Sequence, residues 1–550
     1  MPFPTRPPTS ARLVGPRPAR RSRCSRVGGW LGSGALLVAG LGGLASAPAG
    51  AASGKGGTLV IGMTASQIPN LDTELAALEG YEGDRFVGNQ LYDGLTRFDL
   101  LQSTKVPAVV PDLATSWTAT TNATVWTFKL RQGVTFTDGT PFNADAVIFN
   151  LQRDFDPTFQ YYSSAVGAQA ATLLSQVSSW TKVDDSTVQI TLKAPDSHLP
   201  SDVTTLYFAS PTAVEKEGNT TFGSDPVGTG PFKFVSETAG QQLVLAPNTN
   251  YWAGAPKLSK LILKPIPDPT ARIAALRSGE VNWIEYPTPD DIASLKADGF
   301  EIYQNGYDHI WPWIFDTSQK PWTNVKVRQA ANYAINRQAM ATDLLHGTAT
   351  PAYQVIPPAN AAYTPSNFKY SYNPQKAKQL LKAAGYPHGF TATVSYPTSG
   401  SGNMIPQPMN EELQSTLAKV GIHVNLQPME WSTMLTQYET GKVPGGASAT
   451  NISLTFQQEA FWDYAFLSTS PINVSHYDNP QVDALLTQAA SQTTTAARSK
   501  LYAQAGNLIT QDAPWLFVVN DENPRALASS VHGFVEPKSW FVNLTTVWVS

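Results

Sequence analysis

Apolar and polar residues alternate along the stretch from Thr124 to Val147, which reads TVWTFKLRQGVTFTDGTPFNADAV. The alternation places Trp126, Phe128 and Leu130 on one face, which predicts a strand with one buried side. A second short strand is predicted at residues 134–136, followed by an Asp-Gly turn and the start of a helix. Such a unit packs against its neighbours, so its own side chains are expected to contact no ligand.

Helical periodicity and capping residues predict further helices, most of them in the second half of the chain. Asp268, Asn324 and Asn373 stand at N-cap positions. The predicted helices span residues 165–177, 268–278, 324–335, 373–384, 409–420, 480–490 and 494–510. Strands are predicted at 56–62, 186–192 and 423–429. Because helices and strands alternate between 317 and 519, a parallel α/β sheet is expected there.

The length of the chain bears on the number of domains. At 550 residues it exceeds what one hydrophobic core usually supports, so at least two domains are expected. Hydrophobic residues make up 42% and charged residues 15%, which is typical of a globular protein rather than a disordered one.

The first 51 residues have the pattern of an export signal. Seven arginines and no acidic residue occupy positions 1–26, and an apolar stretch between Trp30 and Leu41 follows. Small residues at 49–51 form the expected cleavage site, while Sec and Tat export both stay open. Cleavage removes Cys24, the only cysteine, so the exported chain is expected to lack disulfides and a lipid-modified cysteine.

The exported chain is acidic. Without the seven arginines of the signal, the 38 Lys and Arg residues fall to 31 against 42 acidic residues, a net charge of −11. This charge disfavours binding to nucleic acid or to an anionic membrane surface. No other apolar stretch reaches about 18 residues, so no membrane span is expected after the signal.

The unit at 124–147 also points to a family. Its aromatic, Gly and Asp-Gly positions resemble the bacterial extracellular solute-binding protein family 5, which includes oligopeptide-, dipeptide- and nickel-binding proteins of ABC importers. Residues 91–95, 111–117, 227–234 and 248–252 resemble further blocks of that family. The resemblance implies an α/β, two-lobed, periplasmic-binding-protein-like fold of the class II type, with an extra subdomain in the first lobe.

The same resemblance implies domain boundaries. After the signal peptide at 1–51, the first lobe is expected at 52–99 and 221–316, with the inserted subdomain at 100–220. The second lobe is expected at 317–519, and the chain returns to the first lobe at 520–550.

By this resemblance the chain is expected to be the substrate-binding component of an ABC importer and not an enzyme. It is expected to capture a solute, foremost a peptide, between the lobes and deliver it to membrane permease and ATPase subunits. The expected protein is a monomer exported to the periplasm or the outer face of the cell envelope, without cofactor, metal or nucleic-acid partner. A nickel chelate, heme or saccharide as solute, and a cell-wall hydrolase, stay open as alternatives.

Two aromatic tracts are candidates for the solute site. The first contains Trp311 and Trp313, in the stretch where the family's chain crosses into the second lobe, and the other contains Phe456 and Trp462. Rings of this size are buried in most proteins, so each either packs in the core or lines the cleft between the lobes.

A Gly- and Ser-rich loop from Tyr396 to Asn403 is a further candidate, because it offers backbone N–H donors. Metal binding has less support. The seven histidines show no HExxH motif and no paired spacing, and His309 and His476 alone are expected near the cleft.

Two carboxylates in the second tract are candidates for binding a solute amine. In the family's peptide binders, an Asp ahead of a Phe-Leu pair holds the peptide ammonium through a charge-assisted hydrogen bond. Matching Phe466-Leu467 to this pair places Glu459 at the Asp position, with Asp463 four residues later. The family's Asp-Tyr-Pro-Asp-Pro run is absent here, so either carboxylate is a candidate for the amine clamp.

Overall fold

The computed structural model describes residues 56–550 except 74–79. The predicted signal at 1–51 lies outside the described residues, and so does Cys24. In the part of the chain that is described, no helix is both long enough and apolar enough to cross a membrane.

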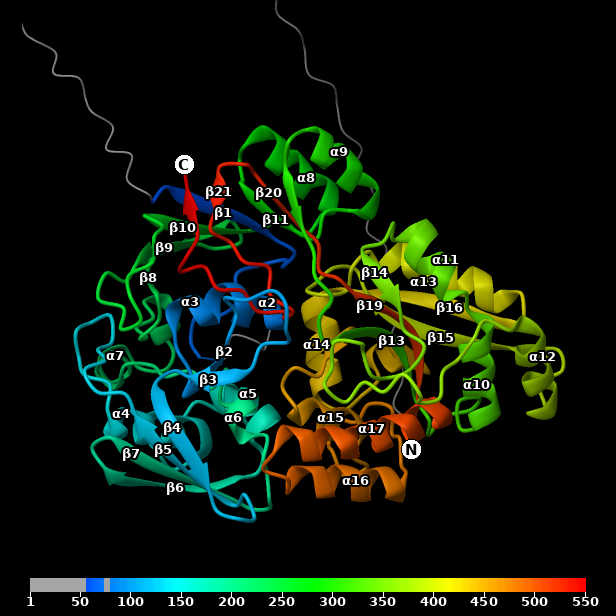
Figure 1. Cartoon of the computed structure of the whole chain (residues 1–550), viewed down its shortest axis with the longest axis horizontal. Coiled ribbons are helices and arrows are strands. Elements are labelled where there is room, and N and C mark those ends of the chain that lie inside the picture. Colours follow the sequence, from blue (N-terminus) through cyan, green and yellow to red (C-terminus); the bar gives the residue numbers. More distant parts are fainter. Residues whose placement is uncertain (1–55, 74–79) are drawn as a thin grey trace, which may run out of the picture. The chain divides into compact units, whose positions relative to one another are not determined.

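The first of two large sheets combines strands from both ends of the described chain (Figure 1). Its central strand β1 runs parallel to both neighbours, whereas the outer pairs are antiparallel. The strand order is β12 (Glu301–Tyr303), β20 (Arg525–Leu527), β11 (Trp283–Glu285), β1 (Thr58–Met63), β10 (Lys260–Pro265), β9 (Gln242–Pro247) and β8 (Phe232–Thr238). Because β20 is a late strand, the chain returns to this sheet near its C-terminus.

The second large sheet is mixed rather than parallel throughout. Its order is β14 (Ala349–Pro351), β19 (Trp515–Asp521), β13 (His309–Phe315), β17 (Ala449–Asn451), β15 (Phe390–Pro397) and β16 (Ile422–Met429), and β18 (Leu454–Thr455) pairs with β13. β15 is parallel to β16 and β17, whereas β13 is antiparallel to β17, β18 and β19. The expectation of a parallel sheet is therefore wrong at this end. β13 leads the chain into the sheet and β19 leads it out toward β20, so these two strands run in opposite directions.

The unit at 124–147 belongs to a four-stranded antiparallel sheet of β4 (Ala114–Ala119), β5 (Val125–Leu130), β7 (Thr187–Leu192) and β6 (Val177–Asp184). Trp126, Phe128 and Leu130 are buried, as their alternation predicted. The short strand expected at 134–136 is wrong. Thr135 forms an isolated bridge to Pro141, which has no N–H with which to extend the pairing.

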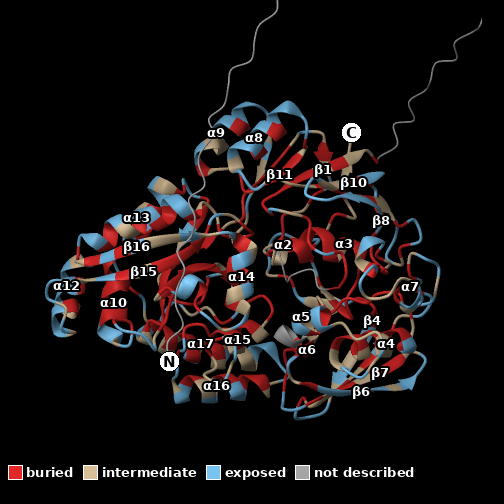
Figure 2. Cartoon of the chain, turned by 180° about the vertical axis from the view of Figure 1, so that it is seen from behind, coloured by how far each residue is buried: buried red, intermediate tan, exposed pale blue. Residues whose placement is uncertain are grey.

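Four of the longer helices begin at a capping Asn or Asp side chain, and the sequence predicted each of these helix starts. Asn143, Asp268, Asn324 and Asn373 each accept a backbone hydrogen bond at the start of a helix. The longer helices of the described residues are α4 (Ala144–Phe155), α5 (Ser164–Leu174), α7 (Pro211–Glu217), α8 (Pro269–Ser278), α9 (Ile292–Ala297), α10 (Val325–Ala334), α12 (Pro374–Ala383), α13 (Pro406–Ala418), α14 (Trp431–Glu439), α15 (Ala460–Phe466), α16 (Pro480–Ala490) and α17 (Thr495–Asp512). Figure 2 shows the buried strands of the second sheet beside helices with exposed outer faces.

Short elements complete the fold. They are α2 (Tyr81–Gly83), α3 (Asn89–Leu91), α6 (Leu199–Asp202), α11 (Arg337–Ala339), β2 (Thr96–Phe98), β3 (Val109–Pro111), β21 (Val531–His532) and β22 (Trp548–Val549). A π-helical turn, Asp84–Gly88, directly follows α2.

Each of the three larger sheets has its own apolar core. Trp313 and Trp515 belong to the core of the second sheet, Leu59 and Trp283 to that of the first, and Phe128 to that of the four-stranded sheet. The lobe boundaries given above stay a prediction, and β13 is part of the second sheet.

Candidate functional site

The tract from Phe456 to Tyr464 forms a wall between two cavities. It follows β18 and continues into α15. Phe461 and Tyr464 line one cavity, whereas Glu459 and Trp462 line the other. The tract that sequence analysis selected therefore contributes side chains to both.

The smaller cavity, here called the aromatic cavity, has a volume of about 90 Å³. Its walls come from segments on both sides of the space between the two large sheets: Tyr81 follows β1, α14 belongs to the second sheet's core, and Trp540 lies near the C-terminus. The rings that line it are Tyr81, Trp431, Tyr438, Phe461, Tyr464 and Trp540.

Polar contacts join the segments on either side of this cavity. The Tyr81 hydroxyl donates to Oε1 of Gln458 at 2.6 Å, and Nε2 of Gln458 donates to the Thr205 hydroxyl at 3.0 Å. The Ser539 hydroxyl donates to Oε1 of Gln457 at 2.7 Å. Two consecutive glutamines of the wall thus hold three separate segments of the chain in contact with the second sheet.

Two carboxyl groups line the aromatic cavity, Asp84 in the π-helical turn and Glu439 at the end of α14. Burial raises the pKa of each from its ordinary value to about 7, and a hydrogen bond from Tyr207 offsets part of this rise for Asp84. Among the described residues, no Lys, Arg or His lines the cavity or perturbs either pKa.

Three polar atoms of the lining have no hydrogen-bond partner within the described part of the chain: Ser401 Oγ, Trp431 Nε1 and Trp540 Nε1. All three side chains are buried. A buried donor left unpaired costs about 1–3 kcal/mol, so such groups normally have a partner. An acceptor group on a bound solute is one way to satisfy them.

Two glycines of the loop at 396–403 allow its backbone to pass close to two aromatic rings of the cavity. Gly400 and Gly402 have φ values of +98° and +71°, which L side chains rarely adopt. A Cβ on Gly402 would lie 1.8 Å from the Trp540 ring, and one on Gly400 would lie 2.5 Å from the Trp431 ring. The predicted loop therefore shapes the cavity, and it does so by close backbone approach.

The two end residues of this loop lie elsewhere. Tyr396 is buried at the end of β15, and the Asn403 carbonyl accepts a 3.1 Å hydrogen bond from Trp311 Nε1. Trp313 Nε1 donates to Oδ1 of Asn410 at 2.6 Å. Trp311 and Trp313 are fully buried and line neither cavity, so they pack in the core of the second sheet.

The larger cavity has a volume of about 490 Å³, and Phe456, Glu459 and Trp462 contribute to its lining. Both oxygens of Glu459 are held by Arg498, whose Nη2 lies 3.1 Å from Oε1 and whose Nε donates to Oε2. This guanidinium already neutralises Glu459, so a solute amine would have to compete with it.

Asp463 belongs to the same wall but lines neither cavity. Burial raises its pKa to about 6, with a small opposing effect from His198. Its Oδ1 has no hydrogen-bond partner among the described residues. The amine clamp formed by Glu459 or Asp463 stays a prediction.

His198 and Tyr502 meet in the larger cavity, where the Tyr502 hydroxyl and His198 Nε2 are 2.5 Å apart. His198, Asp196 and Asp202 also place ligand atoms within 4.8 Å of one another. These atoms have local roles: Asp196 accepts from the His198 backbone N–H, and Asp202 from the Ser201 hydroxyl. The trio therefore serves the start of α6.

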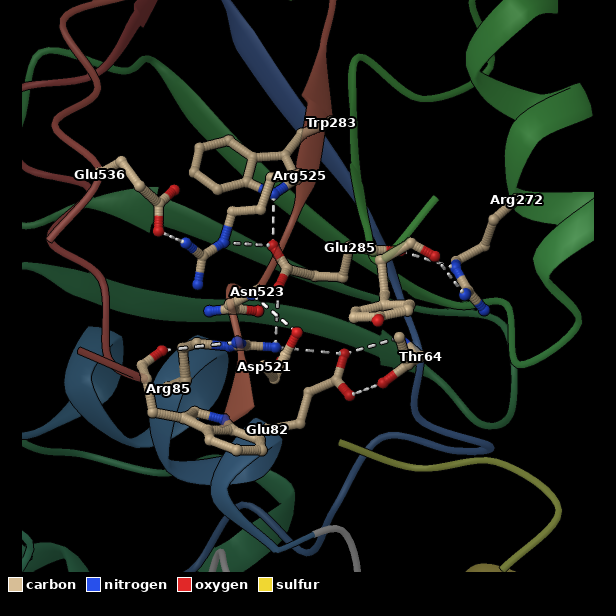
Figure 3. Close-up of polar contacts among 12 residues, drawn as sticks. Thr64, Glu82, Arg85, Arg272, Trp283, Glu285, Asp521, Asn523, Arg525 and Glu536 are labelled. Carbon is tan, nitrogen blue, oxygen red and sulfur yellow. Dashed lines mark hydrogen bonds and ion pairs between the residues drawn. The ribbon is translucent and has the colours of Figure 1, made fainter. Parts of the chain in front are cut away.

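A buried charge network supports one wall of the aromatic cavity (Figure 3). Glu285 accepts from Arg525 Nε at 2.9 Å and pairs with Arg85 Nη2 at 2.9 Å. Arg525 also pairs with Glu536, and Arg85 Nη1 donates to the Trp540 carbonyl at 3.4 Å. The network thereby ties β11 and β20 to the turn that carries Asp84.

Sequence reasoning missed most of the aromatic cavity. Tyr81, Asp84, Trp431, Glu439 and Trp540 come from three segments that are far apart in the chain, and none follows a motif. The paired glycines of the loop at 396–403 were the available signal, because a close approach to bulky side chains favours glycine.

Comparisons with known proteins identify the same family as the resemblance found in the sequence. Residues 108–471 match the family described as bacterial extracellular solute-binding proteins, family 5 Middle. Heme-binding protein A of Haemophilus influenzae is 33% identical over 449 residues, covering 78% of this chain and 82% of the relative. The glutathione-binding protein GsiB of Shigella flexneri is 33% identical over 467 residues, covering 82% and 86%.

Solved structures are similar over most of the chain. The periplasmic binding protein DppA of Helicobacter pylori, in complex with the peptide STSA, has a TM-score of 0.78 at 26% identity, covering 90% of this chain and 98% of its own. A dipeptide-binding protein of Pseudoalteromonas in complex with Met-Leu has a TM-score of 0.78 at 25% identity, covering 90% and 100%. The two-lobed α/β fold expected from the sequence is confirmed.

Proposed function

Because the chain belongs to family 5 of the bacterial extracellular solute-binding proteins, we propose that its solute is a short peptide bound between the two large sheets. The chain is the substrate-binding component of an ABC importer. It binds a small-molecule or peptide solute and delivers it to the permease and ATPase subunits.

The proposal that the solute is a peptide rests on the three unpaired donors of the aromatic cavity. Ser401, Trp431 and Trp540 present O–H and N–H groups beside aromatic walls. A peptide offers carbonyl oxygens that accept from such donors, together with side chains that fill a cavity lined by aromatic rings. The relatives named for peptides and for glutathione support the same class of solute.

Solute capture is coupled to contact between the lobes. Tyr81 and Thr205 both hydrogen-bond to Gln458, so these bonds form only when their segments meet the wall of the second sheet. A solute that touches both sides adds to these bonds and shifts the population toward the closed state. A shift from about 1:99 to 99:1 requires roughly 5.5 kcal/mol of differential affinity.

The proposal extends to location and assembly. The protein acts as an exported monomer in the periplasm or at the outer face of the cell envelope, and it has no catalytic activity of its own. The relatives are solute-binding proteins, and their family is extracellular. Size-exclusion chromatography with light scattering on the purified exported protein checks the monomer, and a mass of two chains would contradict it.

Heme is a second candidate solute. His198 and Tyr502 are both side chains that ligate heme iron in proteins, and they meet in a cavity of about 490 Å³. A relative at 33% identity is named for heme binding. An absorbance titration with hemin separates the candidates: a Soret shift that His198→Ala abolishes supports heme.

A thermal-shift screen tests the proposed function. Purified exported protein is mixed with tripeptide pools, glutathione, oligosaccharides, hemin and nickel–histidine. A solute at about 100 times its Kd adds about 2.7 kcal/mol of stability, which is expected to raise the Tm by a few degrees. A rise with peptides supports the proposal, and a rise with another class alone contradicts it.

A further inference from the structure

The aromatic cavity is lined by two carboxyl groups that have no basic partner in the described part of its lining. Asp84 and Glu439 both line it, while no basic side chain among the described residues does. Asp84 is 5% exposed, so most of its surface is shielded from water. Some buried carboxylates elsewhere in this chain do have basic partners, as Glu285 has Arg85 and Arg525 and as Asp72 has Arg153.

An unpaired carboxylate in such a site is costly. Removing a charge from water is offset only when a counterion or several hydrogen bonds replace the hydration. Burial accordingly raises the pKa of both groups to about 7, although each remains able to ionise near neutral pH. A cation that enters the cavity supplies the missing partner.

The rings of the lining suit the same cation. Trp431, Tyr438, Tyr464 and Trp540 line the same cavity as the two carboxyl-bearing residues. The face of an aromatic ring attracts a nearby ammonium or guanidinium group, most strongly when the site excludes water. Carboxylates and ring faces together favour an organic cation over an anion.

The volume limits how much of the solute this cavity takes. At about 90 Å³ it is smaller than an engineered protein cavity of about 150 Å³ that binds one benzene molecule. One side chain or one amine head group fits, whereas a whole tripeptide does not. The aromatic cavity is thus a pocket for one group of a larger solute.

Building on the proposed function, we infer that the solute carries a cationic nitrogen, and that this nitrogen binds in the aromatic cavity between Asp84 and Glu439. The cation is either a Lys or Arg side chain or a peptide N-terminal ammonium. This position differs from the tract at Glu459, whose carboxylate already has Arg498 as its partner.

Isothermal titration calorimetry with matched peptides tests the inference. The probes are Ala-Lys-Ala and its isostere with norleucine in place of Lys, each with a free and with an acetylated N-terminus. A charge-assisted contact is expected to make the cationic member of the relevant pair bind about tenfold tighter. The difference in affinity between the Lys peptide and the norleucine peptide reports on a side-chain cation. The difference between the peptides with a free and with an acetylated N-terminus reports on the terminal ammonium.

Substitutions assign the effect to the cavity. Asp84→Asn and Glu439→Gln are each expected to remove most of the preference for the cation. Asp478→Asn, at an exposed carboxylate outside the cavity, is the matched control and is expected to keep the full preference. A far-UV circular dichroism spectrum equal to that of the wild type shows that the variants are folded.

The outcomes separate the inference from the proposed function. Peptides that bind equally well with and without a cation overturn the inference and leave peptide binding in place. A preference that survives both cavity substitutions also overturns it, because the cation then binds elsewhere. If no peptide binds, both fail.

Discussion

The Tyr81 hydroxyl and the Gln458 side chain are separated by 377 positions in the sequence and joined by a 2.6 Å hydrogen bond. Tyr81 follows the first strand of the first sheet, and Gln458 belongs to the wall beside the second. The bond therefore reports directly on contact between the two lobes, and the same two residues border the aromatic cavity and its wall.

Loss of this bond is expected to weaken solute binding through closure. Tyr81→Phe removes the hydroxyl but keeps the ring that lines the cavity, so an affinity loss of about fivefold is expected, in keeping with about 1 kcal/mol for one hydrogen bond. Tyr303→Phe removes the hydroxyl of a tyrosine outside both cavities and is expected to have no effect. Equal affinity of Tyr81→Phe and wild type, measured by calorimetry, would show that the bond plays no part in closure.

Gly402 is expected to tolerate no side chain. Gly402→Ala drives a Cβ against the Trp540 ring at a positive φ, so a loss of about 2–4 kcal/mol in the free energy of unfolding is expected. Gly240→Ala is the matched control, since its φ is +67° and no atom lies within 4 Å of the added Cβ. Urea denaturation measures both variants, and equal losses would mean that the contact with Trp540 contributes nothing.

The buried charge network is expected to be essential for stability. Arg525→Met leaves Glu285 and Glu536 without a shared guanidinium, and breaking a buried pair in this way costs about 3–5 kcal/mol. Arg277→Met removes an exposed pair with Asp298, for which about 0–1 kcal/mol is expected. Similar unfolding free energies for the two variants would contradict the role assigned to the network.

Binding of an N-acetylated peptide with a Lys side chain, which stays charged throughout this range, is expected to strengthen as the pH rises from about 6 to 8. The pKa values of Asp84 and Glu439 lie near 7, above the ordinary carboxyl value, so both bind protons in the free protein at pH 6. The tyrosines that perturb these groups or are perturbed by them, Tyr81, Tyr207 and Tyr464, stay neutral in this range, because their own pKa values are raised.

The sign of this effect follows from proton linkage. A cation favours the ionised carboxylates and lowers their pKa, so binding near pH 6.5 releases protons. In the free protein, the stability that the protonated forms contribute is lost as the pH rises through about 7. Calorimetry at pH 6.5 in two buffers of different ionisation enthalpy measures the protons released. Zero protons released, or tighter binding at pH 6 than at pH 8, would contradict the prediction.

Local features of the chain could be predicted because their causes are local. The alternation of Trp126 and Phe128 determines a strand face, and Asn143 caps the next helix with its own side chain. The family resemblance gave the two-lobed arrangement. The direction of β13 against β19 could not be predicted in this way, since their pairing joins segments about 200 residues apart.

The aromatic cavity escaped prediction for a similar reason. Glu459 and Trp462 were found by matching a short tract, yet Arg498, which neutralises Glu459, lies on a later helix. Trp431 and Trp540 face one cavity only because Gly400 and Gly402 allow the backbone between them to pass close to both rings. The periodicity of residues within one segment does not indicate which distant segments pack against it.

A crystal structure of the exported protein with a peptide from the screen tests the central claim most directly. The account predicts peptide density between the two large sheets, one group of it in the aromatic cavity against Asp84 and Glu439, with the bond from Tyr81 to Gln458 in place. Peptide density outside this space, or an aromatic cavity that stays empty with peptide bound elsewhere, would contradict it.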